Sequence, residues 1–253
     1  IDNYKAAWKY LSKLENIEVK DLRKAHFQDI IDKNEDMSKS TLQKIKVLAV
    51  MLCNYAMENG IVDINYASFV ELPKKEKKKK EIFTPEEIKI LEENADKVKW
   101  VDTILILIYS GMRITEMLTL KRENVDLKKE IFTGGIKTDA GKDRIIPIHP
   151  KIYRYVEKWY NKNNEYLIFR DDGREFTANY YRRYIYYPTL EKIGIRKLNP
   201  HSCRHTWASL LADAKVDPKL IQQIMGHSDY AFTANEYTHP DIEQLKNAVK
   251  MVK

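Results

Sequence analysis

The sequence has few cysteines, no long apolar run and no glycine-rich phosphate loop. Its two cysteines, Cys53 and Cys203, are too few for a disulfide framework and too poorly spaced for a zinc site, which favours a reducing cytosol. No run reaches the roughly 18 apolar residues that a transmembrane helix needs, and the longest patch covers only 104–109. The start of the chain lacks the basic and apolar regions of a secretory signal. The missing Walker-type loop argues against ATP as a cofactor.

What the chain does contain is typical of a globular protein of one or two domains. It has 253 residues, of which 43% are hydrophobic and 32% are charged, so a sizeable core is expected. Because the chain opens on Ile1 rather than on methionine, we expect a processed or truncated sequence.

Positive charge is concentrated in one short segment. The net charge is +7, and residues 74–80 hold six lysines and one glutamate, or +5, which leaves +2 for the rest of the chain. Such a segment predicts either a solvated tether between two domains or a contact with a polyanion such as the DNA backbone. The lysines concerned are Lys74, Lys75, Lys77, Lys78, Lys79 and Lys80.

Residues 1–72 show helical patterns and no strand pattern. Apolar side chains recur at helical spacing in three stretches, and the third should begin at Ser38 or Ser40 and end at Gly60. We interpret these stripes as the core of a small helical bundle rather than as a ligand site. Their members are Tyr4, Ala7, Trp8, Leu11, Leu14, Leu22, Phe27, Ile30, Ile31, Ile45, Leu48, Met51, Leu52, Tyr55 and Ala56.

A second domain begins with clear helix-start signals. Thr84 is a candidate N-cap, Pro85 takes the first helical position and Glu87 completes a capping box. A buried segment over 101–109 follows, and between 125 and 148 the periodicity shortens to that of antiparallel strands. Helical patterns return at 152–160, 177–193, 218–226 and 241–252. The predicted fold class is therefore mainly α with a small antiparallel β-sheet.

A set of hydrogen-bond donors in the last quarter of the chain suits a phosphate group. His201 and Arg204 are three residues apart, so on a helix they share a face. Two donors of this kind fit an anionic oxygen centre, for which phosphate is the natural candidate. His227 supplies a further donor just past a helix, and Tyr237 supplies a hydroxyl that can act as a covalent nucleophile.

These residues resemble box II of the tyrosine recombinase, or phage integrase, family. That box reads H-x-x-R, then G-H-S, then a tyrosine followed by Thr-His. The interval between His227 and Tyr237 is most similar to that of conjugative-transposon integrases. Tyr230, the other tyrosine nearby, is followed by Ala-Phe, and Glu236 departs from the neutral residue that the family more often has before its tyrosine.

Two upstream segments resemble further family motifs. Residues 111–116 read G-M-R-I-T-E and resemble box I, in which the turn presents Arg113 while Glu116 orients its guanidinium from behind. The predicted hairpin resembles the one that carries the family's catalytic lysine. That lysine would be Lys137, and Lys142 is the nearby competitor.

The resemblance implies a domain organisation and partners. It implies a helical core-DNA-binding domain over 1–72, a basic linker over 73–81, and a mixed α/β catalytic domain over 82–253. The last helix, about 241–253, would dock on a neighbouring protomer, because too little chain follows it for its own fold to cover it. The partners would be double-stranded DNA at attachment or transposon-end sites and copies of the same chain, as a dimer on one site and a tetramer in the synapse.

The segment 177–193 interleaves arginines with tyrosines. Arg182 and Arg183, together with neighbouring tyrosine hydroxyls, fit a helix laid against DNA phosphates. The alternative is that about half of these rings belong to the core, and the pattern alone does not separate individual residues.

The family chemistry, carried over to these positions, needs neither metal nor ATP. Tyr237 would attack phosphorus while Arg113 and Arg204 bind the phosphate, aided by His201 and His227. His201 would take the tyrosine proton and Lys137 would protonate the departing 5′ oxygen. We find no carboxylate cluster beside these residues to hold the metal of a nuclease. We expect excision and integration of a mobile element by a cytoplasmic, nucleoid-associated bacterial enzyme.

Three alternatives remain. A type IB topoisomerase would share the phosphate clamp and the tyrosine but would act as a monomer. A catalytically inactive DNA-binding relative would keep only the binding surface. A zinc hydrolase would use His201, His205, His227 and His239, which lack a metal-type spacing. Cys203 is expected to be buried on the far side of the helix from His201 and Arg204 and not to act as a nucleophile.

Overall fold

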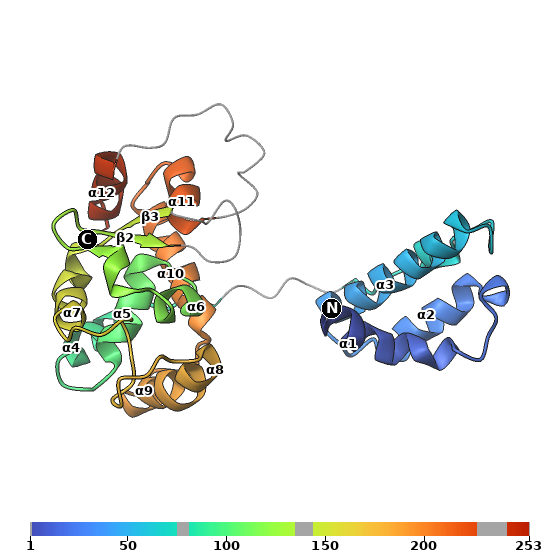
Figure 1. Ribbon diagram of the computed structural model, residues 1–253, viewed down its shortest axis with the longest axis horizontal. Coiled ribbons are helices and arrows are strands. Elements are labelled where there is room, and N and C mark those ends of the chain that lie inside the picture. Colours follow the sequence, from blue (N-terminus) through green and yellow to red (C-terminus); the bar gives the residue numbers. More distant parts are fainter. Residues whose placement is uncertain (1, 75–80, 135–143, 227–241, 253) are drawn as a thin grey trace. The chain divides into compact units, whose positions relative to one another are not determined.

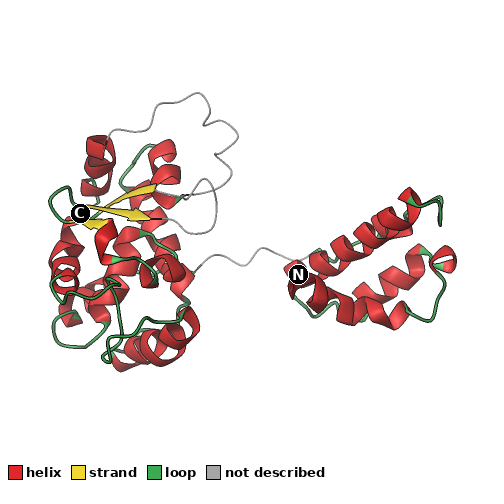
Figure 2. Ribbon diagram, viewed as in Figure 1, coloured by secondary structure: helices red, strands yellow, loops and turns green. Residues whose placement is uncertain are grey.

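The structure is a computed structural model that describes residues 2–74, 81–134, 144–226 and 242–252. The chain divides into two compact units, Ile1–Lys78 and Lys79–Lys253. Both are built mainly from helices, and the second also holds a three-stranded antiparallel sheet (Figures 1 and 2), so the predicted fold class is confirmed. Within the described residues, no helix has the length and apolarity needed to cross a membrane.

The first unit is a small bundle of three α-helices and short 3₁₀ turns. The α-helices are α1 (Asp2–Leu11), α2 (Lys24–Asp32) and α3 (Lys39–Glu58). The 3₁₀ turns are Ser12–Leu14, Val19–Asp21 and Tyr66–Phe69. Of the two predicted caps, Ser38 is the one used, since its side chain accepts from the Thr41 amide, and Gly60 follows the helix with φ +66°.

The prediction that the apolar stripes of this bundle are core is only partly right. Ile30, Ile31 and Ile45 are buried, but five members of the stripes are exposed. These five, from 44% to 65% exposed, are Tyr4, Trp8, Met51, Leu52 and Tyr55. The reason is that apolar residues extend round more of α1 and α3 than the single covered face of a three-helix bundle can bury.

The second unit is organised around one buried helix. All ten residues of α5 (Val101–Ser110) are buried, and α4 (Pro85–Asn94), α7 (Pro150–Tyr160) and α10 (Pro200–Asp213) pack against it (Figure 1). The capping box predicted at Thr84 and Glu87 is present, with reciprocal hydrogen bonds of 2.8 and 3.2 Å. Because these three helices surround α5, its C-terminal end lies in the interior of the unit.

The sheet lies near that end of α5. Strands β1 (Val125–Asp126), β2 (Ile131–Gly134) and β3 (Arg144–Pro147) are antiparallel in the order β1-β2-β3. Phe132 pairs with Ile146, and Gly134 pairs with Arg144 at the end of the β2–β3 ladder. The antiparallel strands predicted in this region are therefore confirmed.

The tyrosine-rich segment forms one helical run. It consists of α8 (Ala178–Tyr180), a π-helical stretch (Tyr181–Tyr186) and α9 (Tyr187–Lys192). Tyr181 and Tyr186 are fully buried, whereas Tyr184 is exposed together with Arg182 and Arg183. The structure thus separates core rings from surface rings, and the DNA contact of the two arginines stays a prediction.

The last two helices differ from expectation in one respect. Asp217 caps α11 (Pro218–Met225) and Gly226 ends it with φ +60°, as predicted. The helix α12 (Ile242–Lys250), however, is covered by its own chain. Leu245, Ala248 and Val249 are buried, and α12 packs on β3 and α11 (Figure 1). The expectation of an uncovered tail was wrong because the sheet offers an apolar face that the helix pattern alone does not reveal.

Candidate active site

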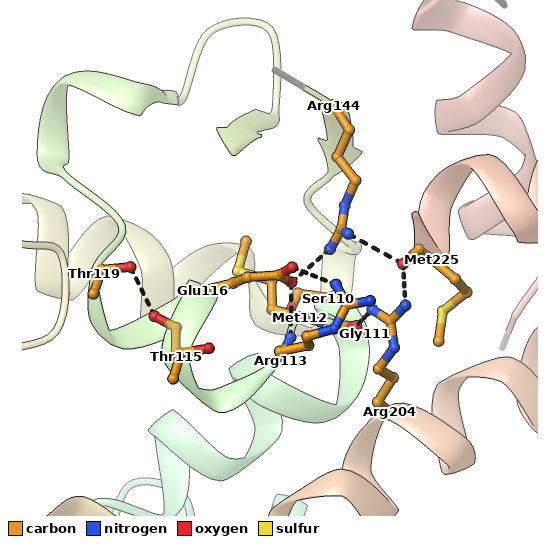
Figure 3. Close-up of polar contacts among 10 residues, drawn as sticks. All are labelled: Ser110, Gly111, Met112, Arg113, Thr115, Glu116, Thr119, Arg144, Arg204 and Met225. Carbon is orange, nitrogen blue, oxygen red and sulfur yellow. Dashed lines mark hydrogen bonds and ion pairs between the residues drawn. The ribbon is translucent and has the colours of Figure 1, made fainter. Parts of the chain in front are cut away.

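Of the predicted box residues that the structure describes, Arg113, Glu116 and Arg204 meet where α5 ends, in a turn that requires glycine. Gly111 has φ +63°, and a Cβ there would lie 2.5 Å from the Trp207 ring and 2.9 Å from the Met225 sulfur. Both the backbone angle and the lack of space therefore favour glycine. This turn brings the start of α6 (Ile114–Leu118) next to α10 and to the end of α11 (Figure 3).

Arg113 is held from behind by Glu116. The Glu116 carboxylate accepts from the Arg113 amide at 2.9 Å and from Arg113 Nη1 at 2.6 Å. The Arg113 side chain keeps 33% of its surface exposed, whereas that of Glu116 keeps 6%. The contact expected from the sequence is present, and it leaves the rest of the guanidinium accessible to a ligand.

Arg204 is bound by two backbone carbonyls. Its Nη1 donates to the Gly111 oxygen at 2.6 Å, and its Nη2 donates to the Met225 oxygen. A guanidinium has five N–H donors, so these two contacts leave three for other partners. Burial, aided by the neighbouring guanidiniums of Arg113 and Arg144, lowers the pKa of Arg204 to about 10.

His201 lies one helical turn before Arg204 on α10. The Asn199 side chain caps this helix by accepting from the His201 and Ser202 amides at 2.8 and 3.2 Å, so the helix starts where predicted. His201 is exposed, and its ring meets that of His205 edge-to-face with centroids 4.6 Å apart. An exposed imidazole thus stands beside the buried Arg204 at the start of α10.

Sequence reasoning missed Arg144, which completes the cluster. Its Nη2 donates to Glu116 Oε2 at 2.9 Å and its Nη1 donates to the Met225 oxygen at 3.1 Å (Figure 3). Its side chain is only 5% exposed. The available signal was a single arginine at the start of the apolar strand Arg144–Pro147, where a charged side chain is unusual unless it is paired.

The cluster carries more positive than negative charge. Burial by itself raises the pKa of Glu116, but Arg144 and Arg113 outweigh it, and the net effect holds that pKa below its usual value. One ionised carboxylate then faces three guanidiniums among the described residues, those of Arg113, Arg144 and Arg204. A surplus of positive charge at a partly exposed arginine suits an anion such as a phosphate.

Several predicted residues lie outside the described ranges. Lys137, His227 and Tyr237 do so, as do the competitors Lys142 and Tyr230, together with Glu236, His239 and the lysines from Lys75 to Lys80. Lys74 is described and is exposed. Arg113, Glu116, His201 and Arg204 are therefore the predicted site residues that the structure brings together.

Two further expectations concern Cys203 and metals. Cys203 is fully buried and lies 3.3 Å from the Tyr186 hydroxyl, and burial raises the pKa of its thiol to about 12, so it is not a nucleophile at neutral pH. In the described part of the chain, no group of three or more His, Cys, Asp or Glu side chains is arranged to hold a metal ion.

The sequence and the fold match known proteins. The sequence pattern of the phage integrase family matches residues 81–244. The tyrosine recombinase XerC of Staphylococcus epidermidis is 28% identical over 250 residues, which is 92% of this chain and 81% of that protein. The tyrosine recombinase XerD of Vibrio cholerae is 28% identical over 154 residues, and this match spans 56% of the chain and 50% of the relative.

Two kinds of solved structure share the fold. A Tn1549 transposon integrase in complex with transposon right end DNA superimposes with a TM-score of 0.78 at 20% identity, over 98% of this chain and 92% of that one. A lambda integrase dimer bound to a COC′ core site gives 0.75 at 15% identity, over 95% of this chain and 90% of that one. Both alignments span the two compact units.

Proposed function

The chain belongs to the phage integrase family of tyrosine recombinases, and we propose that it cuts and rejoins DNA at specific sites to excise and integrate a mobile genetic element. The observation that carries this proposal is the joint positioning of Arg113 and Arg204. Both guanidiniums are fixed by contacts within the chain, with Glu116 and with the Gly111 and Met225 carbonyls. Preorganised donors of this kind stabilise the charge that builds on a phosphate under attack.

In the proposed reaction, the Tyr237 hydroxyl attacks a backbone phosphorus. The bond between the tyrosine oxygen and phosphorus forms while the bond to the 5′ oxygen breaks, which gives a 3′-phosphotyrosyl link and a 5′-hydroxyl. His201 takes the tyrosine proton, Lys137 returns a proton to the leaving oxygen, and His227 donates to the phosphate. One phosphoester replaces another, so the step needs neither ATP nor a metal ion. The 5′-hydroxyl of a partner strand then reverses it.

The proposed partner is double-stranded DNA, bound by copies of this chain. The exposed Arg182 and Arg183 and the lysines of 74–80 supply candidate phosphate contacts. The mobile-element role is supported by the shared fold with a Tn1549 transposon integrase, and the dimer on one site by the shared fold with a lambda integrase dimer on a core site. In the tetramer, we propose that α12 leaves its own sheet and docks on a neighbour. A cytoplasmic, nucleoid-associated location goes with this role.

A covalent-trapping assay tests the proposal. A nicked suicide substrate that carries the crossover sequence, incubated in EDTA, should form a protein–DNA adduct with the natural protein. Tyr237→Phe should form none, whereas Tyr230→Phe, the matched control, should form as much as the natural protein. An adduct that persists in Tyr237→Phe would disprove the assigned nucleophile.

A second candidate is a monomeric type IB topoisomerase-like enzyme. One observation favours it: α12 is buried against its own chain, so the catalytic unit is covered without a neighbour. The two candidates differ in their dependence on protein concentration. A monomer should relax a supercoiled plasmid lacking recombination sites at a rate linear in protein. A recombinase should require two specific sites and should show a steeper dependence.

A further inference from the structure

Arg144 is a buried charge that the proposed chemistry does not use. It lies at the first position of β3 and pairs across the ladder with Gly134. The whole residue, backbone included, is 8% exposed. Its Nε finds no hydrogen-bond partner among the described residues. Burial of the guanidinium disfavours its charged form. The ion pair with Glu116 and the hydrogen bond to the Met225 oxygen are therefore both needed to stabilise the buried charge.

Each of its two contacts leads to a different catalytic arginine. Through Nη2, Arg144 shares the Oε2 atom of Glu116 with the Arg113 amide, at 2.9 Å in both cases. Through Nη1, it shares the Met225 oxygen with Arg204 Nη2. Arg144 therefore touches two of the three groups that fix the phosphate-binding guanidiniums, Glu116 on α6 and the Met225 carbonyl at the end of α11.

The chain makes room for this bridge with a glycine. A Cβ at position 226 would lie 2.3 Å from Arg144 Nη1 and 3.0 Å from Arg144 Cδ, and Gly226 has φ +60°. The guanidinium therefore packs directly on the turn that ends α11.

We propose that Arg144 is a positioning residue for the recombination reaction. It holds Glu116 and the Met225 carbonyl in one geometry and so aligns Arg113 with Arg204 on the same phosphate. This inference rests on the proposed function. Arg144 does not touch the DNA itself, and its effect passes through the two arginines.

A purely structural role of Arg144 and a positioning role predict different effects of its substitution on cleavage. If Arg144 only neutralised Glu116, its loss would lower the fraction of folded protein and would slow every substrate equally. A positioning role predicts a loss that depends on the charge of the scissile phosphate, because aligned guanidiniums matter most where negative charge develops. A methylphosphonate, in which one charged non-bridging oxygen is a methyl group, needs this stabilisation less.

The test measures single-turnover adduct formation by full-length protein on a phosphate and on a methylphosphonate suicide substrate. Arg144→Met should slow cleavage of the phosphate by roughly 100-fold, the loss typical of a misplacement of about 1 Å. The decrease in cleavage rate that Arg144→Met causes on the methylphosphonate should be several-fold smaller. Equal losses on both substrates would overturn the positioning role. If the natural protein forms no adduct with either substrate, the proposed function fails together with the inference.

A matched control and a milder variant complete the test. Arg122, a half-buried arginine of the second unit, donates to the Tyr160 oxygen at 3.0 Å, and Arg122→Met should leave cleavage of both substrates unchanged. Arg144→Lys keeps a positive charge beside Glu116 but cannot span both acceptors as a planar fork does. If Arg144→Met does not fold, Arg144→Lys should still show a loss several-fold larger on the phosphate. Cleavage of the phosphate by Arg144→Lys at the natural rate would overturn the inference.

Discussion

The two compact units place their apolar and charged side chains in opposite ways. Among the described residues, every exposed large hydrophobic side chain except Ile82, Tyr184 and Met251 lies in the first unit. Every buried carboxylate and guanidinium of the described residues lies in the second unit: Asp102, Glu116, Arg144 and Arg204. The first unit thus has a small hydrophobic core and many exposed apolar side chains. The second unit has a larger core, which also contains buried charged side chains. Substitutions of charged residues should therefore change the stability of the second unit strongly, whereas the stability of the first unit should depend on its few buried apolar residues.

The largest effect is expected from Glu116→Gln. This change leaves Arg144, whose side chain is 5% exposed, without its ionic partner. Breaking a buried ion pair in this way typically costs about 3–5 kcal/mol. Hydrogen exchange followed peptide by peptide should show the loss in residues 79–253 and unchanged protection in 2–74.

The control for that change is an ion pair on the surface of the same unit. Glu165 pairs with Lys121 at 3.3 Å, with both side chains exposed, so Glu165→Gln should cost less than about 1 kcal/mol. Equal costs for the two substitutions would mean that the second unit does not depend on its internal charges.

A slightly smaller effect is expected from Leu42→Ala in the first unit. Leu42 is fully buried, and truncating such a residue costs about 2–5 kcal/mol. A small domain has little stability to lose, so exchange protection should collapse throughout this unit. The second unit should keep its protection.

Leu107→Ala is the matched change in the second unit, since Leu107 is also fully buried. It should lower the stability of that unit without unfolding it, because the core there is larger. If Leu42→Ala lowers protection in both units equally, the chain unfolds as one cooperative body and the comparison fails.

A pH effect should distinguish the units next. His149 is buried in the second unit, its Nε2 lies 2.9 Å from the Val252 oxygen, and its Nδ1 accepts from the Lys151 amide at 3.2 Å. Burial lowers the pKa of His149 below its usual 6.5, so the unfolded chain takes up the proton more readily than the folded one. Its contribution to stability is complete above pH 6.5 and is lost as pH falls through the folded pKa.

The Tm of the second unit should therefore decrease as pH falls from 7 toward 5, while that of the first unit should change less. His149→Asn can cap the same helix and does not titrate, so its profile should be flatter. Calorimetry at fixed ionic strength measures both profiles. If the Tm of the natural protein and that of His149→Asn fall in parallel with pH, a group other than His149 causes the decrease.

The sequence predicts the local features of this molecule well. The Thr84 capping box, the Asp217 cap and the Gly111 turn depend on neighbours within a few residues, so short patterns identify them. Helix periodicity also predicts which residues share a face. It does not predict whether another element covers that face, and for this reason Tyr55 was wrongly assigned to the core.

The candidate site shows the same limit. Arg113, Glu116 and Arg204 follow from spacing and from the family resemblance. The expected contact of Glu116 with Arg113 is present, and the catalytic roles of the two arginines stay predictions. Arg144 was missed because its partners, Glu116 and Met225, are 28 and 81 residues away in the sequence. Long-range pairing of this kind leaves little local trace beyond an arginine at the start of an apolar strand. The cover that β3 provides for α12 is likewise a tertiary property.

The smallest effect is expected on the exposed face of the first unit. Tyr55 is 65% exposed on α3, so Tyr55→Gln should change the stability of that unit by no more than about 0.5 kcal/mol. The same exchange at Tyr181, which is fully buried and lies 2.5 Å from the Thr103 hydroxyl, should cost about 3–5 kcal/mol in the second unit. Urea unfolding of both variants measures the contrast. If Tyr55→Gln destabilises the first unit as much as Leu42→Ala does, the uncovered side chains contribute to its fold, and the two units differ less than their surfaces indicate.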